Sequence, residues 1–387
     1  MTLVPPILML IVASGLFLMI RAGRKVLADP FAEPVEEPER WPSAAIVIPV
    51  SGADPGIPGC LRSILNQDYP DFEVVFSVKD AEDPAAALIA GLIVDRTGAR
   101  LVHAGEADRG GQKNHNLLAG LKVVSASREV LVFCDSTHEA RRDWLRELVR
   151  PLALGKFEAA NGFHLAVPVW GGFIAWGRAI SALFIYLMKC FPATDQPWGG
   201  ATAIRADLFH RLEVDRVWES HSFDDACLNV LLRKNRRPLA MTPRAVLYTF
   251  LGRQTLAGWR HWVLRQWLGL KFYSYWNWAG AGVACWLCTL LLAFSVFRVA
   301  AAVSGWMSVT GALVPALFLS VLAFLGSRLR GIHPRPTRAV PWLAAFFATI
   351  LLASWVHMET WFTMELPWKG IVYRVAPGGK VLEIRKK

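Results

Sequence analysis

The sequence lacks several motifs that would assign it to well-known classes of protein. Its six cysteines include only one CxxC, at Cys285 and Cys288 within an apolar run, so neither a disulfide scaffold nor a paired zinc site is expected. No GxGxxG or Walker loop is present, so no glycine-rich phosphate motif competes for a nucleotide. No internal repeat or low-complexity tract is visible, and a repeat architecture is therefore not expected.

The composition instead indicates an integral membrane protein. Of the 387 residues, 54% are hydrophobic and 17 are tryptophan, which is too apolar for an ordinary soluble enzyme. The formal net charge is +11, from 42 Lys and Arg against 31 Asp and Glu. Because the basic residues flank apolar segments and do not gather in one tail, contact with a membrane explains them better than nucleic acid does. We expect no nucleic-acid partner.

The first apolar segment is predicted to be an N-terminal membrane anchor. It runs from Val4 to Ile20, lacks a small-residue cleavage site, and is followed by Arg21, Arg24 and Lys25. Positive charge on that flank places the following residues in the cytoplasm. No retention signal of the KDEL type is present, which favours a bacterial inner membrane over an endomembrane.

Three further apolar runs near the C-terminus set the predicted domain layout. They extend over 279–303, 310–326 and 339–361, and each is close to the ~20 residues that a helix needs to cross a bilayer. The sequence therefore predicts four regions: a membrane anchor in 1–28, a Pro/Glu-rich linker in 29–42, a cytosolic domain in 43–270, and a membrane domain with a tail in 271–387.

The last apolar run conflicts with a simple spanning helix. Arginines at 328, 330, 335 and 338 precede it, and Arg385, Lys386 and Lys387 follow it. Both basic clusters are typical of the cytoplasmic side of a membrane. A full span would separate them, so we expect 339–361 to lie in the interface or to re-enter.

A fifth apolar segment, 168–190, interrupts the cytosolic region. It contains Arg178 among several Trp and Tyr residues, which is typical of an amphipathic helix that lies in the plane of the membrane interface. A buried core helix is the alternative.

The cytosolic region alternates strands and helices. Apolar, β-branched runs predict strands at 44–50, 72–78, 100–103 and 129–135, and helices are expected at 60–67 and 88–95. This alternation predicts an α/β domain with a mostly parallel, doubly wound sheet. Such sheets bind their ligands at the carboxyl ends of the strands.

Acidic residues occur where these elements end. They are Asp80, Glu82 and Asp83 after the second strand, Asp135 after the run 129–134, and Asp224 and Asp225 before a predicted helix at 226–233. Taken singly, each is explained by a solvated turn or a helix cap. Three such groups in one domain favour a shared role, in which one contacts a nucleotide, one holds a divalent cation and one acts as general base.

The order of short motifs resembles family-2 glycosyltransferases of GT-A fold. The motifs are Pro49-Val50, Asp83-Pro84-Ala85, Gln112-Lys113-Asn114-His115-Asn116-Leu117, Cys134-Asp135-Ser136 and Asp224-Asp225. The chain is most similar to ceramide glucosyltransferase and its bacterial lipid-glycosylating relatives, whose W-x-G-x-x-Y ending resembles Trp368–Arg374. The resemblance covers roughly residues 40–270 and the tail. It implies a GT-A nucleotide-sugar-binding domain with N-terminal and C-terminal transmembrane helices.

The resemblance also implies roles for individual acids. Asp83 would bind the nucleotide, Asp135 would hold a metal ion, Mg²⁺ or Mn²⁺, on the donor, and Asp225 would be the general base. Thr137 stands where the D-x-D motif usually has its second Asp, and ceramide-type relatives share this departure.

Three further positions complete the expected site. Arg265 would contact the departing diphosphate and Trp267 the acceptor, although one residue is inserted in their Arg-Gln-Trp version of the family signature. An interfacial helix rich in Arg and Trp is the alternative for that segment. Lys113 would pair with a phosphate as a point charge, and a solvated loop lysine is its alternative.

The expected activity is that of an inverting membrane glycosyltransferase. It would move glucose or a similar sugar from a UDP-sugar to a lipid hydroxyl, such as that of ceramide, diacylglycerol or a hopanoid, at the bilayer surface. A polysaccharide synthase or a polyprenyl-phosphate sugar transferase is the first alternative. A non-catalytic membrane protein with a degraded transferase domain is the second. The sequence indicates no oligomeric state.

Overall fold

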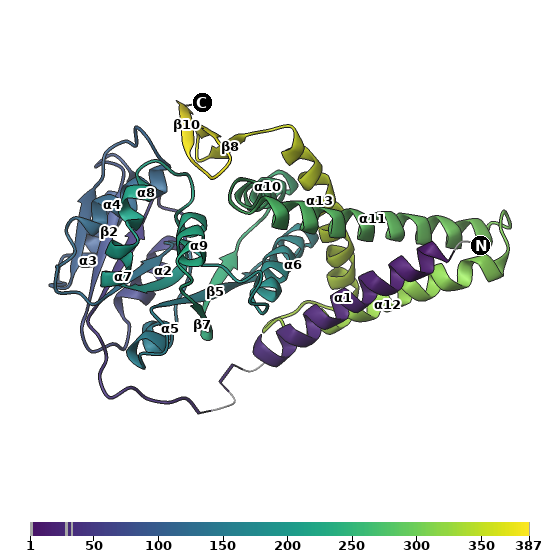
Figure 1. Cartoon of the computed structure of the whole chain (residues 1–387), viewed down its shortest axis with the longest axis horizontal. Helices are drawn as coiled ribbons and strands as arrows, with labels where there is room; N and C mark the ends of the chain where they lie inside the picture. Colours follow the sequence, from purple (N-terminus) through teal and green to yellow (C-terminus); the bar gives the residue numbers. More distant parts are fainter. Residues whose placement is uncertain (1–2, 28–29, 32–33, 387) are drawn as a thin grey trace. The chain divides into compact units, whose positions relative to one another are not determined.

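The computed structural model describes residues 3–27, 30–31 and 34–386, which divide into two compact units (Figure 1). The helical unit comprises Met1–Asp29, Ala166–Thr194 and Leu251–Thr363, as far as these are described. The sheet unit comprises Pro30–Leu165, Asp195–Phe250 and Met364–Lys387, with the same restriction. Residues 1, 2 and 28 of the predicted anchor 1–28 and residues 29, 32 and 33 of the predicted linker 29–42 lie outside the described residues.

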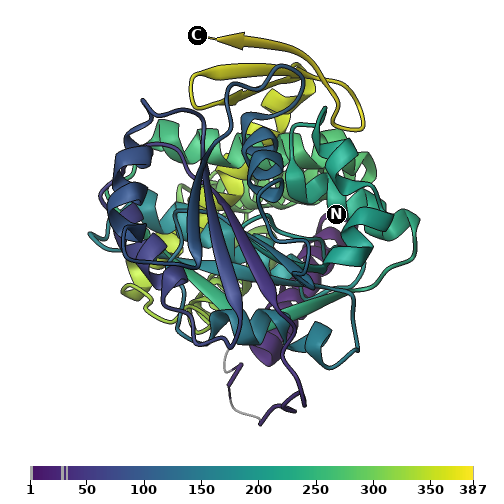
Figure 2. The same cartoon turned by 90° about the vertical axis from the view of Figure 1, so that its left-hand side faces the viewer.

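A seven-stranded sheet forms the centre of the sheet unit (Figure 2). Its order is β3-β2-β1-β4-β6-β5-β7, with parallel pairs between β1 and β2, β1 and β4, and β2 and β3. The strand β6 is antiparallel to both β4 and β5. The strands are β1 (Ala44–Pro49), β2 (Phe72–Val78), β3 (Ala99–His103), β4 (Val130–Cys134), β5 (Ala159–Pro168), β6 (Ala201–Arg205) and β7 (Leu239–Leu251).

Burial on both faces explains why these apolar runs become strands. In β1 the side chains from Ala44 to Ile48 have no exposed surface, and all five residues of β4 are buried. Parallel strands covered by helices on both faces consist of such continuous β-branched runs. The predicted strands agree with β1 to β4 within one residue at each end, and the predicted fold class, α/β with a mostly parallel sheet, is confirmed.

Helices connect the strands. They are α2 (Ile57–Leu65), α3 (Pro84–Ile93), α4 (Gln112–Leu121), α5 (Trp144–Ala153), α7 (Ala206–Arg211), α8 (Val214–Trp218) and α9 (Asp224–Lys234). Of these, α2, α3 and α4 begin after the carboxyl ends of the parallel strands β1, β2 and β3. The helix α3 begins where Asp83 caps it: the Asp83 carboxylate accepts a hydrogen bond from the Ala85 N–H at 2.9 Å. The predicted helices at 60–67, 88–95 and 226–233 correspond to α2, α3 and α9.

A second, three-stranded antiparallel sheet ends the chain and belongs to the sheet unit. Its strands are β8 (Glu365–Trp368), β9 (Ile371–Val375) and β10 (Val381–Lys386). The two-residue turn between β8 and β9 has positive φ at both Lys369 (43°) and Gly370 (79°). Such a turn matches the twist of the two strands, although a lysine rarely adopts this conformation. The Lys369 ammonium donates to the carbonyl of Ser51 at 2.9 Å.

The helical unit contains the apolar segments. Its elements are α1 (Val4–Leu27), α6 (Phe173–Met188), α10 (Leu256–Tyr273), α11 (Tyr275–Val303), the 3₁₀ turn η1 (Val309–Ala312), α12 (Leu313–Arg330) and α13 (Ala339–Trp361). Four helical segments of the described chain, Val4–Leu27, Tyr275–Val303, Val309–Arg330 and Ala339–Trp361, are long and apolar enough to cross a membrane. These segments confirm the four predicted apolar helices, including the N-terminal one.

The helix α6 is shorter than the predicted segment 168–190. The strand β5 continues to Pro168, and Gly171 and Gly172, with φ of 68° and 100°, precede the helix. With 16 residues α6 is too short to span a bilayer, and ten of those residues are buried. It packs tightly on α10, because a Cβ on Gly177 would lie 2.2 Å from the Trp259 ring. Its predicted place in the membrane interface stays a prediction.

The two ends of the segment 251–363 are tied to the same sheet unit. Residues 195–250 precede the segment and 364–386 follow it, and within that unit the Val381 N–H donates to the Ser220 carbonyl at 2.8 Å. If the whole sheet unit lies on one side of a membrane, the chain between its parts must cross that membrane an even number of times. The helices α11, α12 and α13 would make three crossings if each one spanned it. This constraint favours the predicted in-plane or re-entrant course for one of them, and the arginine-rich loop before α13 points to that helix.

Replacing Ile46 by alanine is expected to destabilise the protein by about 2–5 kcal/mol, because the side chain is fully buried in an interior strand and leaves a cavity. Denaturation of the purified protein in detergent, followed by near-UV circular dichroism, measures the loss. Val94→Ala is the matched control, because Val94 is 77% exposed and its truncation should cost less than about 0.5 kcal/mol. Equal losses in the two variants would contradict the burial of β1.

Candidate active site

A single carboxylate follows the interior strand β4. This strand is parallel to β1 on one side and antiparallel to β6 on the other, and all its side chains are buried. The next side chain, Asp135, is 30% exposed. Because α/β sheets present ligand-binding groups at the carboxyl ends of parallel strands, Asp135 stands where a ligand is expected.

The ammonium group of Lys113 joins Asp135 to a second acid. Lys113 is the second residue of α4, and its Nζ atom lies 2.8 Å from Asp135 Oδ1 and 3.0 Å from Asp224 Oδ1. Asp224 is the first residue of α9, and its side chain is only 5% exposed. One cation therefore links the end of β4 with the first turns of α4 and α9.

A glycine allows the acid pair to approach this cation closely. The Gly199 N–H donates to Asp225 Oδ2 at 3.1 Å, and Asp225 Oδ1 accepts from the Ala226 N–H at 2.7 Å. A Cβ atom on Gly199 would lie 2.2 Å from Asp224 Oδ2 and 2.7 Å from Lys113 Nζ, so a larger residue there would displace the ion pair. The structure thus brings Lys113, Asp135 and Asp225, three of the predicted site residues, into one cluster with Asp224.

The charges of this cluster set its pKa values. Burial would raise the pKa of Asp135, but the charge of Lys113 and the nearby His138 hold it below its usual range. Burial raises the pKa of Asp224 to about 6 against the opposing charge of Lys113, with contributions from the neighbouring acids. Burial would lower the pKa of Lys113, but the three acids outweigh burial and raise it. Asp135 and Lys113 are therefore charged at neutral pH, whereas Asp224 titrates just below it.

Backbone contacts fix the acid pair relative to α4. The buried Asn114 side chain donates to the His221 carbonyl at 2.9 Å, and the Gly111 N–H donates to the same carbonyl at 3.0 Å. A Cβ on Gly111 would lie 2.9 Å from the Ser222 carbonyl oxygen, so this close approach also requires glycine. The loop before α9 is therefore held against the first turn of α4, which carries Lys113.

The C-terminal sheet holds the same two loops, a contribution that the sequence motif alone did not reveal. The Tyr373 hydroxyl accepts a hydrogen bond from the Gln112 N–H at 3.2 Å, next to Lys113. The Ser222 N–H donates to the Gly379 carbonyl at 3.1 Å, two residues before the acid pair. The sequence similarity at Trp368–Arg374 marked this segment, but no residue pattern indicated which loops it would contact.

Asp83 lies at the same sheet edge and has a structural task. Its Oδ1 atom accepts from the Gly52 N–H at 2.8 Å and also caps α3, so it joins the loop after β1 to the start of α3. The strands β2, β1 and β4 are neighbours, and therefore Asp83 and Asp135 follow strands that lie about 10 Å apart. The predicted role of Asp83 in nucleotide binding stays a prediction, and its capping bond holds the loop that would border the nucleotide.

Two histidines and a threonine lie behind Asp135. His138 and His164 are buried, and the Nδ1 atoms of both rings lie 2.7 and 2.6 Å from Thr249 Oγ1. A hydroxyl has one hydrogen to donate, so at most one ring accepts from Thr249 and at least one ring donates to it. His138 Nε2 lies 3.8 Å from Asp135 Oδ2. The buried His138 ring therefore packs beside the Asp135 carboxylate.

Arg265 and Trp267 belong to the other unit. Both lie on α10, and the Trp267 side chain is buried with its ring centroid 4.7 Å from that of His357. Their predicted contacts with the diphosphate and the acceptor stay predictions.

The donor set suits a divalent cation that is held jointly with a phosphate ligand. Among the described residues, no three His, Cys, Asp or Glu side chains are grouped as a metal site. Mg²⁺ commonly binds one or two carboxylates together with substrate phosphates and water, not an all-protein cage. Asp135 offers one partly exposed, ionised carboxylate, and three acids against one lysine leave an excess of negative charge. These residues fit the expected cation in that mode.

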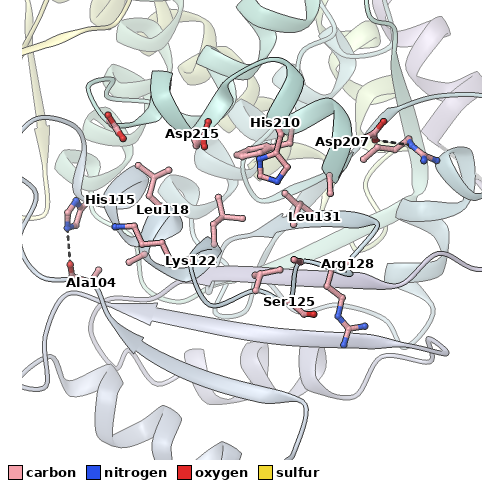
Figure 3. Close-up of a pocket in the computed structure, with 18 of the residues that line it drawn as sticks. Ala104, His115, Leu118, Lys122, Ser125, Arg128, Leu131, Asp207, His210 and Asp215 are labelled. Carbon is pink, nitrogen blue, oxygen red and sulfur yellow. Dashed lines mark hydrogen bonds and ion pairs between the residues drawn. The ribbon is translucent and has the colours of Figure 1, made fainter.

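A cavity of about 930 Å³ occurs on another part of the sheet unit (Figure 3). Side chains of α4, α7 and the loop before β4 line it, but none of the four cluster residues does. Its charged groups are largely paired: Arg128 contacts Asp71 and Glu73, and Asp207 contacts Arg205 and Arg211. This cavity therefore offers no chemistry comparable to that around Asp135.

Comparison with known sequences supports the resemblance found from the motifs. Residues 7–158 match the model of the family described as Glycosyl transferase family 21. A ceramide glucosyltransferase from Komagataella phaffii is 36% identical over 56 residues, which are 14% of this chain. The chain thus aligns with 11% of the length of that curated relative.

Comparison with solved structures finds glycosyltransferases of low sequence identity. A mannosyltransferase from Pyrobaculum calidifontis, in complex with GDP-mannose and Mn²⁺, is 15% identical with a TM-score of 0.46, and the alignment covers 92% of this chain and 96% of that one. Glucosyl-3-phosphoglycerate synthase from Mycobacterium tuberculosis, in complex with Mn²⁺, UDP and phosphoglyceric acid, is 16% identical with a TM-score of 0.37, over 61% and 76% of the two chains. The sequence matches together confirm the resemblance to glycosyltransferases of the ceramide glucosyltransferase kind.

Proposed function

We propose that the chain is an inverting glycosyltransferase that transfers a sugar from a UDP-sugar to the hydroxyl group of a membrane lipid. The cluster of Lys113, Asp135, Asp224 and Asp225 at the carboxyl end of a parallel sheet is the observation that carries this proposal. The family match over residues 7–158 and the four apolar helices support it.

The donor would lie along the sheet edge, from Asp83 to Asp135. The loop after β1, which Asp83 holds through the Gly52 N–H, would border the nucleoside. The diphosphate would lie near Asp135, where a bound divalent cation would neutralise its charge. Lys113 keeps the Asp135 carboxylate ionised and oriented, and its raised pKa ensures that it remains a cation.

The acceptor would react beside Asp225. As the acceptor oxygen bonds to the anomeric carbon, its proton passes to the Asp225 carboxylate, and the bond between that carbon and the diphosphate oxygen breaks with its electron pair leaving on UDP. Attack from the face opposite the leaving group inverts the configuration. Two backbone N–H groups, of Gly199 and Ala226, orient the Asp225 carboxylate for this role. Arg265 is the proposed partner of the departing diphosphate and Trp267 that of the acceptor.

A lipid acceptor agrees best with the helices of the chain. A polymer synthase normally needs more spanning helices to line a channel, whereas the described chain has four candidate spans, of which α13 is the one expected to lie in the interface. The helix α6, with exposed Trp170 and Phe173 just before and at its start, would rest on the membrane surface and give access to lipid. We propose a bacterial inner membrane with the sheet unit in the cytosol.

Replacing Asp135 by asparagine is expected to abolish sugar transfer, because the neutral amide loses the charge that would hold the cation and the donor diphosphate. The measurement is UDP release and lipid-product mass from purified protein with Mg²⁺ or Mn²⁺ and a panel of UDP-sugars. Asp108→Asn is the control, since the Asp108 side chain is 81% exposed and lies outside the cluster. Full activity of the Asp135 variant would contradict the proposed function.

Replacing Asp225 by asparagine is expected to lower kcat by about 10²–10⁴-fold, the usual contribution of a general base, while the affinity for UDP changes little. Single-turnover kinetics and calorimetric UDP binding separate these two effects. An unchanged kcat would assign the base elsewhere, with Asp224 the next candidate.

The transfer rate is expected to fall as pH drops through about 6. Below its pKa Asp224 is protonated, so Lys113 pairs with Asp135 alone and competes with the cation there. Asp224→Asn should be slower than wild type at neutral pH and should lack this acidic limb. Profiles of kcat/KM between about pH 5 and 8 test the assignment, and identical acidic limbs in both proteins would contradict it.

A further inference from the structure

Arg178 carries a half-buried charge that no acid of the described chain neutralises. It lies in the second turn of α6, and its Nε atom is buried without a hydrogen-bond partner. No carboxylate contributes to its electrostatic surroundings within the described residues, and its one ring contact is with Trp262, 4.3 Å from the guanidinium carbon to the ring centroid.

The charge that acts on Arg178 has the same sign. Burial, together with the positive charge of Arg265, lowers the pKa of Arg178 to about 9, so the group remains a cation at neutral pH. Trp262 and Arg265 are three residues apart on one face of α10. The Arg178 guanidinium therefore stacks on the Trp262 ring and lies near the charge of Arg265.

Three other arginines of the helical unit have oxygen partners. Arg260 forms two hydrogen bonds with Glu359, at 2.8 and 2.6 Å, and Arg330 and Arg298 donate to backbone carbonyls. A guanidinium beside another one, away from bulk water, is costly unless an anion compensates it. The tight packing of Gly177 on Trp259, one residue before Arg178, fixes α6 against α10 and prevents Arg178 from moving away.

We propose that Arg178 binds a phosphate-bearing anion, together with Arg265, over the face of Trp262. A planar guanidinium binds two oxygens of a phosphate at once, and the aromatic ring beneath it restricts its orientation. The anion is either the donor diphosphate or the headgroup of an anionic phospholipid, which share this chemistry. The first case deepens the proposed function, on which it rests, because it adds a second arginine to the site of the departing diphosphate.

The test compares Arg178→Gln with Arg253→Gln, a charge-matched control whose arginine is exposed just before α10. Calorimetry in detergent measures the binding of UDP, uridine and inorganic diphosphate, and activity is measured in nanodiscs of phosphatidylcholine with or without phosphatidylglycerol. For a donor site, Arg178→Gln should bind UDP and inorganic diphosphate about tenfold more weakly, the effect of one charged hydrogen-bonded contact, with uridine unchanged. Arg253→Gln should match wild type.

Other outcomes separate the two sources of the anion. Unchanged UDP binding with a loss of the response to phosphatidylglycerol assigns the site to a lipid headgroup. Unchanged binding and an unchanged lipid response would overturn the proposal. If Arg178→Gln melts at a lower temperature, Arg178→Lys separates a loss of anion binding from a loss of stability. The lysine keeps the charge, so this variant should bind UDP with intermediate affinity. Wild-type protein without affinity for UDP would refute the proposed function, while inorganic diphosphate and the lipid response still test Arg178.

Discussion

The cluster at the sheet edge depends on the ion pairs of one lysine. The Lys113 ammonium lies between Asp135 and Asp224, which come from parts of the chain about 90 residues apart, and without it two buried or half-buried acids would repel each other. The charge of Lys113 lowers the pKa of Asp135 and limits the rise that burial causes in the pKa of Asp224. Asp135 therefore stays ionised, whereas Asp224 has a pKa of about 6. Geometry and electrostatics of the candidate site therefore share a single origin.

The surrounding backbone serves to keep that lysine in place. A Cβ at Gly111 would crowd the backbone of Ser222, and one at Gly199 would displace Asp224 and Lys113. The C-terminal sheet bonds to both the start of α4 and the loop before α9. The tail therefore acts as a structural part of the sheet unit and not as a loose extension. Its attachment also restricts how the intervening helices cross a membrane, since both flanks of the helical segment 251–363 belong to one unit.

Much of the fold was predictable because its signals are local. Buried parallel strands must be continuous β-branched runs, and membrane helices must be long and apolar, so β1 to β4 and the four candidate spans follow from the order of residues. Acids at the ends of strands were likewise visible, and Asp135, Asp225 and Lys113 do lie together. The sequence did not show that Asp224 would hold Lys113, or that His138 and His164 would share the Thr249 hydroxyl behind Asp135.

The sequence by itself determined which segments are strands, which are apolar helices and which residue types stand at their ends, because each of these depends on the side chains of neighbouring residues. Tertiary structure alone decided that Asp224 is the buried member of the acid pair and that the C-terminal sheet attaches to the start of α4. It also decided that Arg178 stacks on the Trp262 ring near the charge of Arg265. These features depend on burial and on charges from distant segments, and no local pattern encodes the distance between residues that are far apart in the chain.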